Sequence, residues 1–330
     1  MKCINKPRLR SCILFVVVTS ILFCGCGASK EEVLQPYQVY DNANYQFESS
    51  AESADIATFS NDLCVIGTED SSLDNTDYQA IGGAGYFNVT TGEVKYAYHL
   101  HDKLYPASTT KILTCYIAVT TTNLDDIVTV SENAVNQASD SSVCELEAGD
   151  QISMRDLLYG MMLRSGNDAA VAIAEYISGD ISAFATLMND TARKLGATNS
   201  NFVNPNGLPD ENHYTTVYDM YLILNKAIQN SDFLQIFTSH AYTASYTDAS
   251  GLGVTKDWVS TNKYLIGEES APDGMTVLGG KTGTTGDAGY CLVQLVADSV
   301  GNQYIIIVFK ADSRWNLYLL MDEMMTYYSD

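Results

Sequence analysis

The sequence predicts an α+β fold in which the two ends of the globular chain form one sheet and helices cover it. Segments with strand character lie at 80–100 and again at 275–310, whereas segments with helical periodicity fill the stretch between them and follow the last strand. The 330 residues are 46% hydrophobic and 18% charged, which allows a core to be buried and argues against a disordered chain. The sequence contains no internal repeat, and no second domain is expected.

Each predicted element follows from a local pattern. Residues 80–88 and 93–100 are expected to pair as strands, because Val89-Thr90-Thr91-Gly92 between them is a hairpin signal. Apolar residues that recur with helical spacing predict five helices in the middle of the chain, at 108–122, 153–164, 168–178, 181–195 and 216–229. Turns containing glycine separate three further strand segments, at 275–282, 289–297 and 303–310, and an amphipathic helix is expected at 313–328.

The charge balance argues against nucleic acid as a partner. The chain has 18 Lys and Arg against 40 Asp and Glu, a formal charge of −22. The four bases Lys2, Lys6, Arg8 and Arg10 all precede residue 26 and no acid does, so the chain without this leader keeps 14 bases against 40 acids, a charge of −26. A body this acidic repels phosphate backbones and anionic lipid surfaces.

The first 26 residues have the layout of a secretory signal. A basic start is followed by an apolar run of about 13 residues, shorter than the roughly 20 that a spanning helix needs, and then by small residues. Cys26, preceded by Gly25, resembles the acceptor cysteine of bacterial lipoproteins, although Phe23 stands where Leu is usual. We therefore expect a signal peptide at 1–25 with lipid on Cys26; ordinary cleavage and free secretion is the alternative.

Two further regions follow the leader. Residues 27–61 are rich in Glu, Ser, Asn, Asp and Gln with few apolar clusters, a composition that predicts a flexible tether. From residue 62 to 330 the pattern is globular. The cysteines of this part are scattered without a C-x-x-C pair: Cys64, Cys115, Cys144 and Cys291. Sequence cannot choose among their three possible pairings, and buried free thiols are the expectation. No metal-site spacing is present, and no cofactor is expected.

The first motif that carries chemistry is Ser108-Thr109-Thr110-Lys111, which opens the first strong helix. Residues i and i+3 share a helix face, so the Ser108 hydroxyl and the Lys111 amine can meet there. A lysine with a lowered pKa can take the proton of a serine nucleophile, and a helix N-terminus offers N–H groups to a developing anion. The motif is weak alone, because Ser260-Thr261-Asn262-Lys263 also fits it.

Two other motifs follow along the chain. The second begins at Ser165, 57 residues after Ser108, and the third begins at Lys281, 116 residues after Ser165. Ser165-Gly166-Asn167 lies in a polar break between two apolar helices, where a helix cap and a catalytic corner are compatible roles. Lys281-Thr282-Gly283 is expected by chance only about 0.1 times in a chain of this length. It ends a strand, and a lysine, a hydroxyl and a bare glycine there suit a cleft that receives a peptide carboxylate.

The order S-x-x-K, S-x-N, K-T-G is typical of penicillin-binding proteins and β-lactamases. The flanking segments YPASTTKILT, LLYGMMLRSGNDAAVAIAE, FVNPNGLPDENHYTTVYDM, STNKYL and GGKTGTTGDAGYCLV resemble the serine D-alanyl-D-alanine carboxypeptidases, the low-molecular-mass penicillin-binding proteins, over residues 80–328. STNKYL falls where that family has an N-x-N-x-L-L segment, so Ser260 is not the nucleophile. The resemblance implies an α/β/α sandwich with a central, mainly antiparallel five-stranded sheet, as in β-lactamases and transpeptidases.

The resemblance also implies a role for each motif residue. Ser108 would attack the penultimate D-Ala of a peptidoglycan stem peptide, with Lys111 as the base, and Ser165 and Asn167 would complete the proton path and hold the substrate amide. Lys281 and Thr282 would bind the terminal carboxylate, and Arg314 would lie near it. Gly283 would also belong to the substrate-binding residues. The backbone N–H groups of Ser108 and Thr284 would form the oxyanion hole. β-Lactam antibiotics would be covalent inhibitors.

The chain departs from the family at its ends. Members often carry a β-rich second domain and a C-terminal amphipathic helix on the membrane, whereas this chain stops at Asp330 after the last expected helix. The lipid on Cys26 would then be the anchor, and the protein would lie at the outer face of the cytoplasmic membrane or in the cell wall.

Three other functions compete with this prediction. A class A β-lactamase needs a deacylating glutamate on a loop after the second motif, but Glu175 lies in a helical pattern. A zinc carboxypeptidase needs clustered ligands, and His99-x-His101 is the only histidine pair. A catalytically silent cell-wall-binding lipoprotein of the same fold is the alternative from a different class. His213, in a family-like segment, is interpreted as structural.

Overall fold

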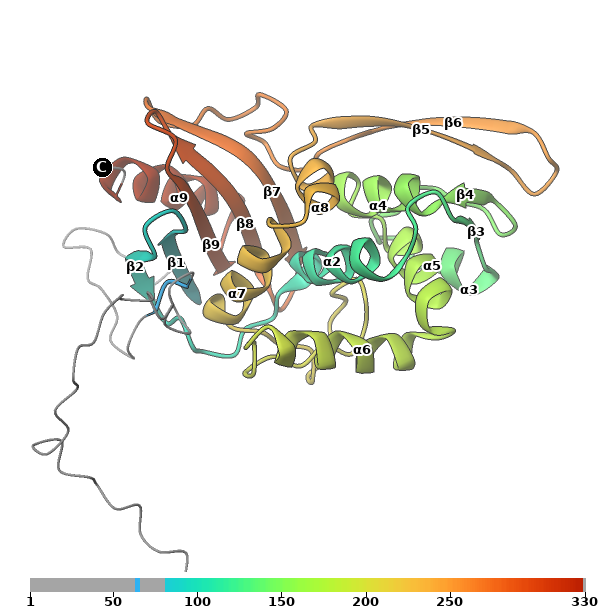
Figure 1. Ribbon diagram of the computed structural model, residues 1–330, viewed down its shortest axis with the longest axis horizontal. Helices are drawn as coiled ribbons and strands as arrows, with labels where there is room; N and C mark the ends of the chain where they lie inside the picture. The colour runs from blue at the N-terminus through green and yellow to red at the C-terminus, as the bar shows by residue number, and fades with distance from the viewer. Residues whose placement is uncertain (1–62, 66–80, 329–330) are drawn as a thin grey trace, which may run out of the picture. The chain divides into compact units, whose positions relative to one another are not determined.

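A five-stranded antiparallel sheet is built from both ends of the part of the chain that the computed structural model describes, residues 63–65 and 81–328 (Figure 1). The predicted signal peptide, Cys26 and the tether at 27–61 lie outside these residues. The strand order is β2-β1-β9-β8-β7, with the bounds β1 (Gly83–Asn88), β2 (Glu93–Tyr98), β7 (Met275–Thr285), β8 (Gly289–Asp298) and β9 (Gln303–Ala311). Every neighbouring pair is antiparallel, so the predicted sheet is confirmed.

The central strand β9 explains why helices cover both faces of this sheet. Its apolar run alternates between two cores, because successive side chains of a strand point to opposite faces. Tyr304, Ile306 and Val308 pack in the cluster that contains helix α9, whereas Ile305 and Ile307 pack in the larger cluster that contains the middle helices. A strand buried on both faces reads as a continuous apolar segment, as this one does.

Every helix that the periodicity predicts is present. The longer ones are α2 (Lys111–Thr121), α4 (Met154–Leu163), α5 (Asn167–Ser178), α6 (Ile181–Lys194), α7 (Val217–Ala227), α8 (Ser231–Phe237) and α9 (Arg314–Tyr328), and the short ones are η3 (Ala107–Thr110) and α3 (Glu132–Val135). Of these, α3 and α8 were not predicted. Polar side chains cap the N-termini of several helices. The Ser153 side chain accepts a hydrogen bond from the backbone N–H of Asp156 at α4, and the Thr216 side chain accepts one from the backbone N–H of Asp219 at α7. α7 packs on one face of the sheet and α9 on the other, which completes the α/β/α sandwich (Figure 1).

Among the described helices, none by itself has the length and hydropathy to cross a membrane; α5 and α6, bent by 83°, meet that criterion only as a pair and by length and composition alone.

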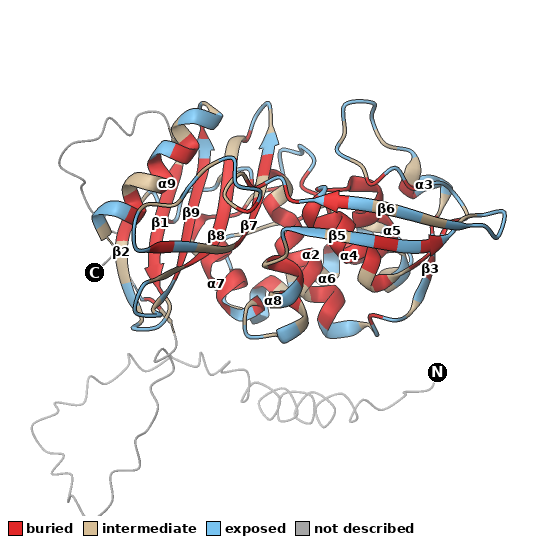
Figure 2. Ribbon diagram, turned by 90° about the horizontal axis from the view of Figure 1, so that it is seen from above, coloured by how far each residue is buried: buried red, intermediate tan, exposed pale blue. Residues whose placement is uncertain are grey.

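A second, four-stranded antiparallel sheet was not predicted. Its order is β3-β4-β5-β6, with the bounds β3 (Ile127–Thr129), β4 (Gln151–Ser153), β5 (Ala241–Thr247) and β6 (Gly253–Val259). In β5 only Ala244 and Tyr246 are buried between exposed neighbours, because the hairpin rests one face on α4 and exposes the other (Figure 2). An alternation this short, in a hairpin this polar, gives a weak sequence signal.

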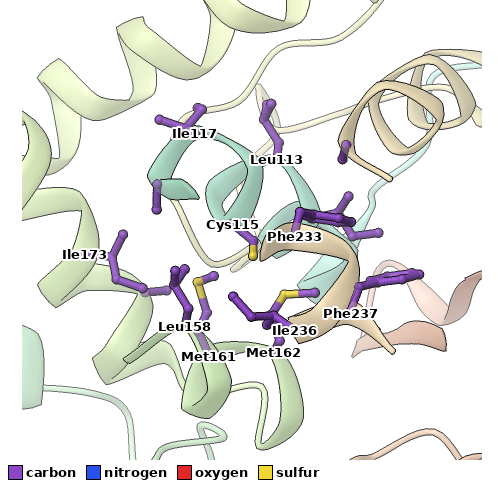
Figure 3. Close-up of a cluster of buried hydrophobic side chains, with 14 of the residues drawn as sticks. Leu113, Cys115, Ile117, Leu158, Met161, Met162, Ile173, Phe233, Ile236 and Phe237 are labelled. Carbon is purple, nitrogen blue, oxygen red and sulfur yellow. The ribbon is translucent and has the colours of Figure 1, made fainter. Parts of the chain in front are cut away.

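The helix α2 runs through the centre of the larger core and is buried on nearly all sides (Figure 2). Figure 3 shows how side chains of α2, α4, α5 and α8 meet around it: Leu113, Cys115, Ile117, Leu158, Met161, Met162, Ile173, Phe233, Ile236 and Phe237. The cysteines at 64, 115, 144 and 291 are buried free thiols, as expected. Close packing of this kind holds α2 in one position, and therefore also holds the side chains of its first turn in place.

Candidate active site

The first motif forms a tight turn at the start of α2. Ser108 lies in η3, and Lys111 begins α2 one turn later. The Lys111 Nζ donates a hydrogen bond of 3.0 Å to the Ser108 Oγ, and the hydroxyl of Thr109 closes the turn on the carbonyl of Pro106 at 2.7 Å. The structure thus brings the predicted nucleophile and base into direct contact.

Lys111 is completely buried and has two further acceptors. Its Nζ donates to the Asn167 Oδ1 and to the backbone carbonyl of Asn206, each at 2.8 Å. Burial, and next the positive charge of Lys281, lowers the pKa of Lys111 well below its ordinary value of 10.5. A neutral amine has two N–H groups and one lone pair. If Asn167 and Asn206 take the two N–H groups, the lone pair faces Ser108.

The second motif joins the other two. Ser165 lies between α4 and α5 with a φ of 59°, a left-handed conformation that few non-glycine residues adopt and that is often found at functional sites. Its Oγ accepts a hydrogen bond of 3.0 Å from the Lys281 Nζ of the third motif. Asn167, which contacts Lys111, begins α5, and its backbone N–H donates to the carbonyl of Ser142 at 2.8 Å. The second motif therefore contacts Lys111 through Asn167 and Lys281 through Ser165.

The third motif lies on β7, the edge strand of the five-stranded sheet. Lys281 is buried, and burial lowers its pKa to about 7. Gly283 faces η3 so closely that a Cβ at this position would lie 2.9 Å from the backbone nitrogen of Ser108 and 3.0 Å from the carbonyl oxygen of Pro106. Only a residue without a side chain lets β7 come this near to the nucleophile.

A cavity of about 380 Å³ opens where the three motifs meet. Its lining includes residues from each motif and from the start of α9: Ser108, Ser165, Thr282, Gly283, Thr284 and Arg314. The guanidinium carbon of Arg314 lies 5.9 Å from the ring centre of Tyr290, which lines the same cavity. All predicted site residues are therefore brought together, apart from Cys26, which lies outside the described residues.

Three features of the site were not predicted. The Thr261 Oγ1 lies 2.5 Å from the Thr282 Oγ1, and Thr261 lines the cavity; its place in the N-x-N-like segment was the available signal. The carbonyl of Asn206 has no signal in the sequence, because every residue carries one. His213, interpreted as structural, is buried and contacts the Thr110 Oγ1 of the first motif at 2.8 Å.

The residues considered for competing functions lie elsewhere or are otherwise engaged. The carboxylate of Glu175, on α5, accepts hydrogen bonds from the Ser131 Oγ at 2.5 Å and the Asn133 Nδ2 at 2.7 Å. The Nδ1 of His99 pairs with Asp102 at 3.0 Å. Residues 63–65 and 81–328 contain no group of three or more His, Cys, Asp or Glu that could hold a metal ion.

Comparisons with known proteins identify the family. The family model described as D-alanyl-D-alanine carboxypeptidase matches residues 82–313. The chain is 35% identical over 230 residues to D-alanyl-D-alanine carboxypeptidase DacF of Bacillus subtilis, covering 68% of this chain and 55% of DacF. It is also 35% identical over 225 residues to D-alanyl-D-alanine carboxypeptidase of Streptomyces sp. strain K15, covering 65% of this chain and 75% of that protein.

Solved structures of related enzymes have a similar fold. The crystal structure of the Streptomyces K15 DD-transpeptidase aligns with a TM-score of 0.66 at 30% identity, covering 75% of this chain and 94% of that one. D-alanyl-D-alanine carboxypeptidase DacD from Francisella tularensis aligns with a TM-score of 0.67 at 27% identity, covering 79% of this chain and 72% of that one. The chain spans about half the length of several curated relatives that it matches, such as 55% of DacF and 50% of DacC of Escherichia coli.

Proposed function

Because the chain belongs to the D-alanyl-D-alanine carboxypeptidase family of peptidases, we propose that it is a serine D,D-carboxypeptidase that removes the terminal D-Ala from peptidoglycan stem pentapeptides. The observation that carries the proposal is the contact of the buried Lys111 with Ser108, Asn167 and the Asn206 carbonyl. A serine hydroxyl in contact with a basic side chain is an arrangement that can activate the serine for nucleophilic acyl transfer. We assign this activity to residues 62–330.

In acylation, the neutral amine of Lys111 takes the hydroxyl proton of Ser108 as its Oγ bonds to the carbonyl carbon of the penultimate D-Ala. The electron pair of the carbonyl moves to its oxygen, which the backbone N–H groups of Ser108 and Thr284 stabilise. Such a donor contributes about 3–4 kcal/mol in comparable acyl transfers. The C–N bond then breaks, and the proton reaches the leaving amine of D-Ala through Lys111 and Ser165.

The substrate carboxylate is held on the far side of the cavity. The Thr282 hydroxyl donates to this carboxylate, and positive charge comes from Arg314 and from Lys281, whose Nζ also contacts the Ser165 Oγ. The bare edge at Gly283 leaves room for the substrate backbone beside β7. Water then hydrolyses the ester on Ser108 and restores the enzyme. A β-lactam ring opens by the same attack, but its product stays attached to Ser108.

Mixing the protein that begins at residue 27 with benzylpenicillin tests this function. We expect intact mass to show a long-lived adduct of one penicillin per chain, and no adduct on Ser108→Ala. If penicillin stays intact and no adduct forms, the chain is a silent binding module. If penicillin is destroyed and no adduct persists, the chain is a β-lactamase. Release of D-Ala from a pentapeptide then establishes turnover.

We also propose that the protein is exported and lipid-anchored at the outer face of the cytoplasmic membrane. The basic start, short apolar run and Gly25-Cys26 support a lipoprotein-type signal at 1–25, with residues 27–61 as the tether. Two or more acyl chains would hold the protein on a membrane, since each buried CH₂ contributes about 0.8 kcal/mol.

Changing Cys26 to alanine tests the anchor. We expect Cys26→Ala, or globomycin treatment of the unchanged protein, to block processing or to release the protein from the membrane fraction. If processing and fractionation both stay as they were, the anchor proposal is wrong. The catalytic proposal does not depend on this outcome.

A further inference from the structure

A loop between α6 and α7 crosses the first turn of α2, and we call residues 203–213 the strap. Three contacts hold it there. The Thr114 Oγ1 donates to the carbonyl of Pro205 at 2.7 Å, and the Lys111 Nζ donates to that of Asn206 at 2.8 Å. His213, the last residue of the strap, contacts the Thr110 Oγ1 at 2.8 Å. The strap thus delivers one of the three acceptors of Lys111.

His213 joins both ends of the strap to the first motif. Its Nδ1 accepts a hydrogen bond of 3.2 Å from the backbone N–H of Val203, the first strap residue. An imidazole that accepts at Nδ1 carries its proton on Nε2, so its Nε2 donates to the Thr110 hydroxyl. The ring is 1% exposed, and burial lowers the pKa of His213 to about 4, so it is neutral at neutral pH. Asp210 opposes this shift and Lys111 adds to it.

The strap has little freedom to move without disturbing Lys111. Gly207, next to Asn206, adopts a φ of 85°, and a Cβ there would lie 1.8 Å from the carbonyl oxygen of Ala107. The strap backbone therefore rests directly on the residue that precedes Ser108. A small displacement of the strap would carry the Asn206 carbonyl away from the Lys111 Nζ.

We propose that His213 is a positioning residue for acylation: by joining Val203 to Thr110, it keeps the carbonyl oxygen of Asn206 on the Nζ of Lys111. The inference rests on the proposed function, in which Lys111 is the base. With the carbonyl in place, the amine has both N–H groups engaged and its lone pair on Ser108. Without it, the amine can rotate and water can reach it.

Loss of the strap contact has two expected consequences. Acylation slows, because a displacement of about 1 Å in a catalytic group can cost about a hundredfold in rate. The acid limb of acylation also moves to higher pH, because a hydrated Lys111 keeps its proton more readily. The other groups that act on Lys111 stay in place: Lys281 on β7, Asp168 on α5, and Cys144 in the loop before β4.

Two variants remove the His213–Thr110 contact while keeping most of the shape. Thr110→Val deletes the acceptor, and His213→Asn keeps an acceptor for the Val203 N–H but withdraws the donor. We expect each to lower the rate of acylation by benzylpenicillin, per folded chain, about tenfold or more, with the acid midpoint at higher pH. For a D-Ala-D-Ala peptide, kcat falls with little change in KM, since neither residue lines the cavity.

Conservative variants and a control separate positioning from stability. Thr110→Ser and His213→Gln retain the acceptor and the donor, and should recover most of the rate and the original midpoint. Ser200→Ala removes hydrogen bonds to the Thr215 Oγ1 and the Asp219 Oδ2 near the strap. We expect it to lower thermal stability and leave the acylation rate per folded chain unchanged.

The inference is overturned if folded Thr110→Val and His213→Asn acylate at the original rate with the original midpoint, or if they behave as Ser200→Ala does. In those cases the unchanged protein is still acylated, so the proposed function stands. If the unchanged protein forms no adduct on Ser108, the proposed function fails and the inference fails with it. The two failures are therefore distinguishable in one experiment.

Discussion

Replacing Lys111 with methionine is expected to slow acylation of Ser108 by about a thousandfold, the middle of the range for a positioned base. Methionine fills a similar volume but cannot take a proton. The fall should appear in the rate at which intact mass gains one benzylpenicillin. In the unchanged protein, acylation should fall as the solution becomes more acidic, because the active form of Lys111 is the neutral amine and protonation through its lowered pKa removes it.

A second substitution and a control make this test specific. Lys111→Arg keeps a positive charge and several donors, yet arginine does not lose its proton in proteins, so its acylation should be as slow as that of Lys111→Met. Lys256→Met removes a lysine of the unpredicted hairpin that pairs with Glu145 at 2.9 Å on the surface, and its acylation should be unchanged. Rapid acylation of folded Lys111→Met would exclude Lys111 as the base.

The sequence predicts the elements of the large sheet because their patterns are local and long. The apolar run of β9 and the hairpin between β1 and β2 need no knowledge of their partners. The count of five strands came from the family resemblance, whereas the strand order was not predicted and is seen only in the structure. The hairpin of β5 and β6 was missed because half of its side chains face solvent and the buried half depends on the position of α4.

The site divides in a similar way. Side chains that do chemistry have a residue type and a spacing, and Ser108, Lys111 and Lys281 could be predicted from them. The Asn206 carbonyl could not, because its role depends on where the strap lies. His213 lies 103 residues after Thr110, and only the fold brings the two together. The interpretation of His213 as structural agrees with its burial, and the positioning role proposed above rests on its contact with Thr110.

Gly207→Ala is expected to be the most damaging single-methyl change in the strap. Glycine adopts a φ of 85° freely, whereas an L-residue there costs about 1–2 kcal/mol. The added Cβ would also lie 1.8 Å from the carbonyl oxygen of Ala107. Forcing an extra methyl group into a packed core costs about 1–3 kcal/mol more. The free energy of unfolding, measured in urea, should fall by about 3 kcal/mol.

Gly251→Ala is the matched control, because it isolates the backbone cost. Gly251 has nearly the same φ, 87°, but nothing lies within 4 Å of its added Cβ. The free energy of unfolding of Gly251→Ala should fall by only about 1–2 kcal/mol, and this variant should be acylated at the original rate. Folded Gly207→Ala should acylate more slowly, because the strap must move away from Ala107 and take the Asn206 carbonyl with it. Equal stability loss and equal acylation in the two variants would mean that the close approach of the strap to the nucleophile turn is not needed for catalysis.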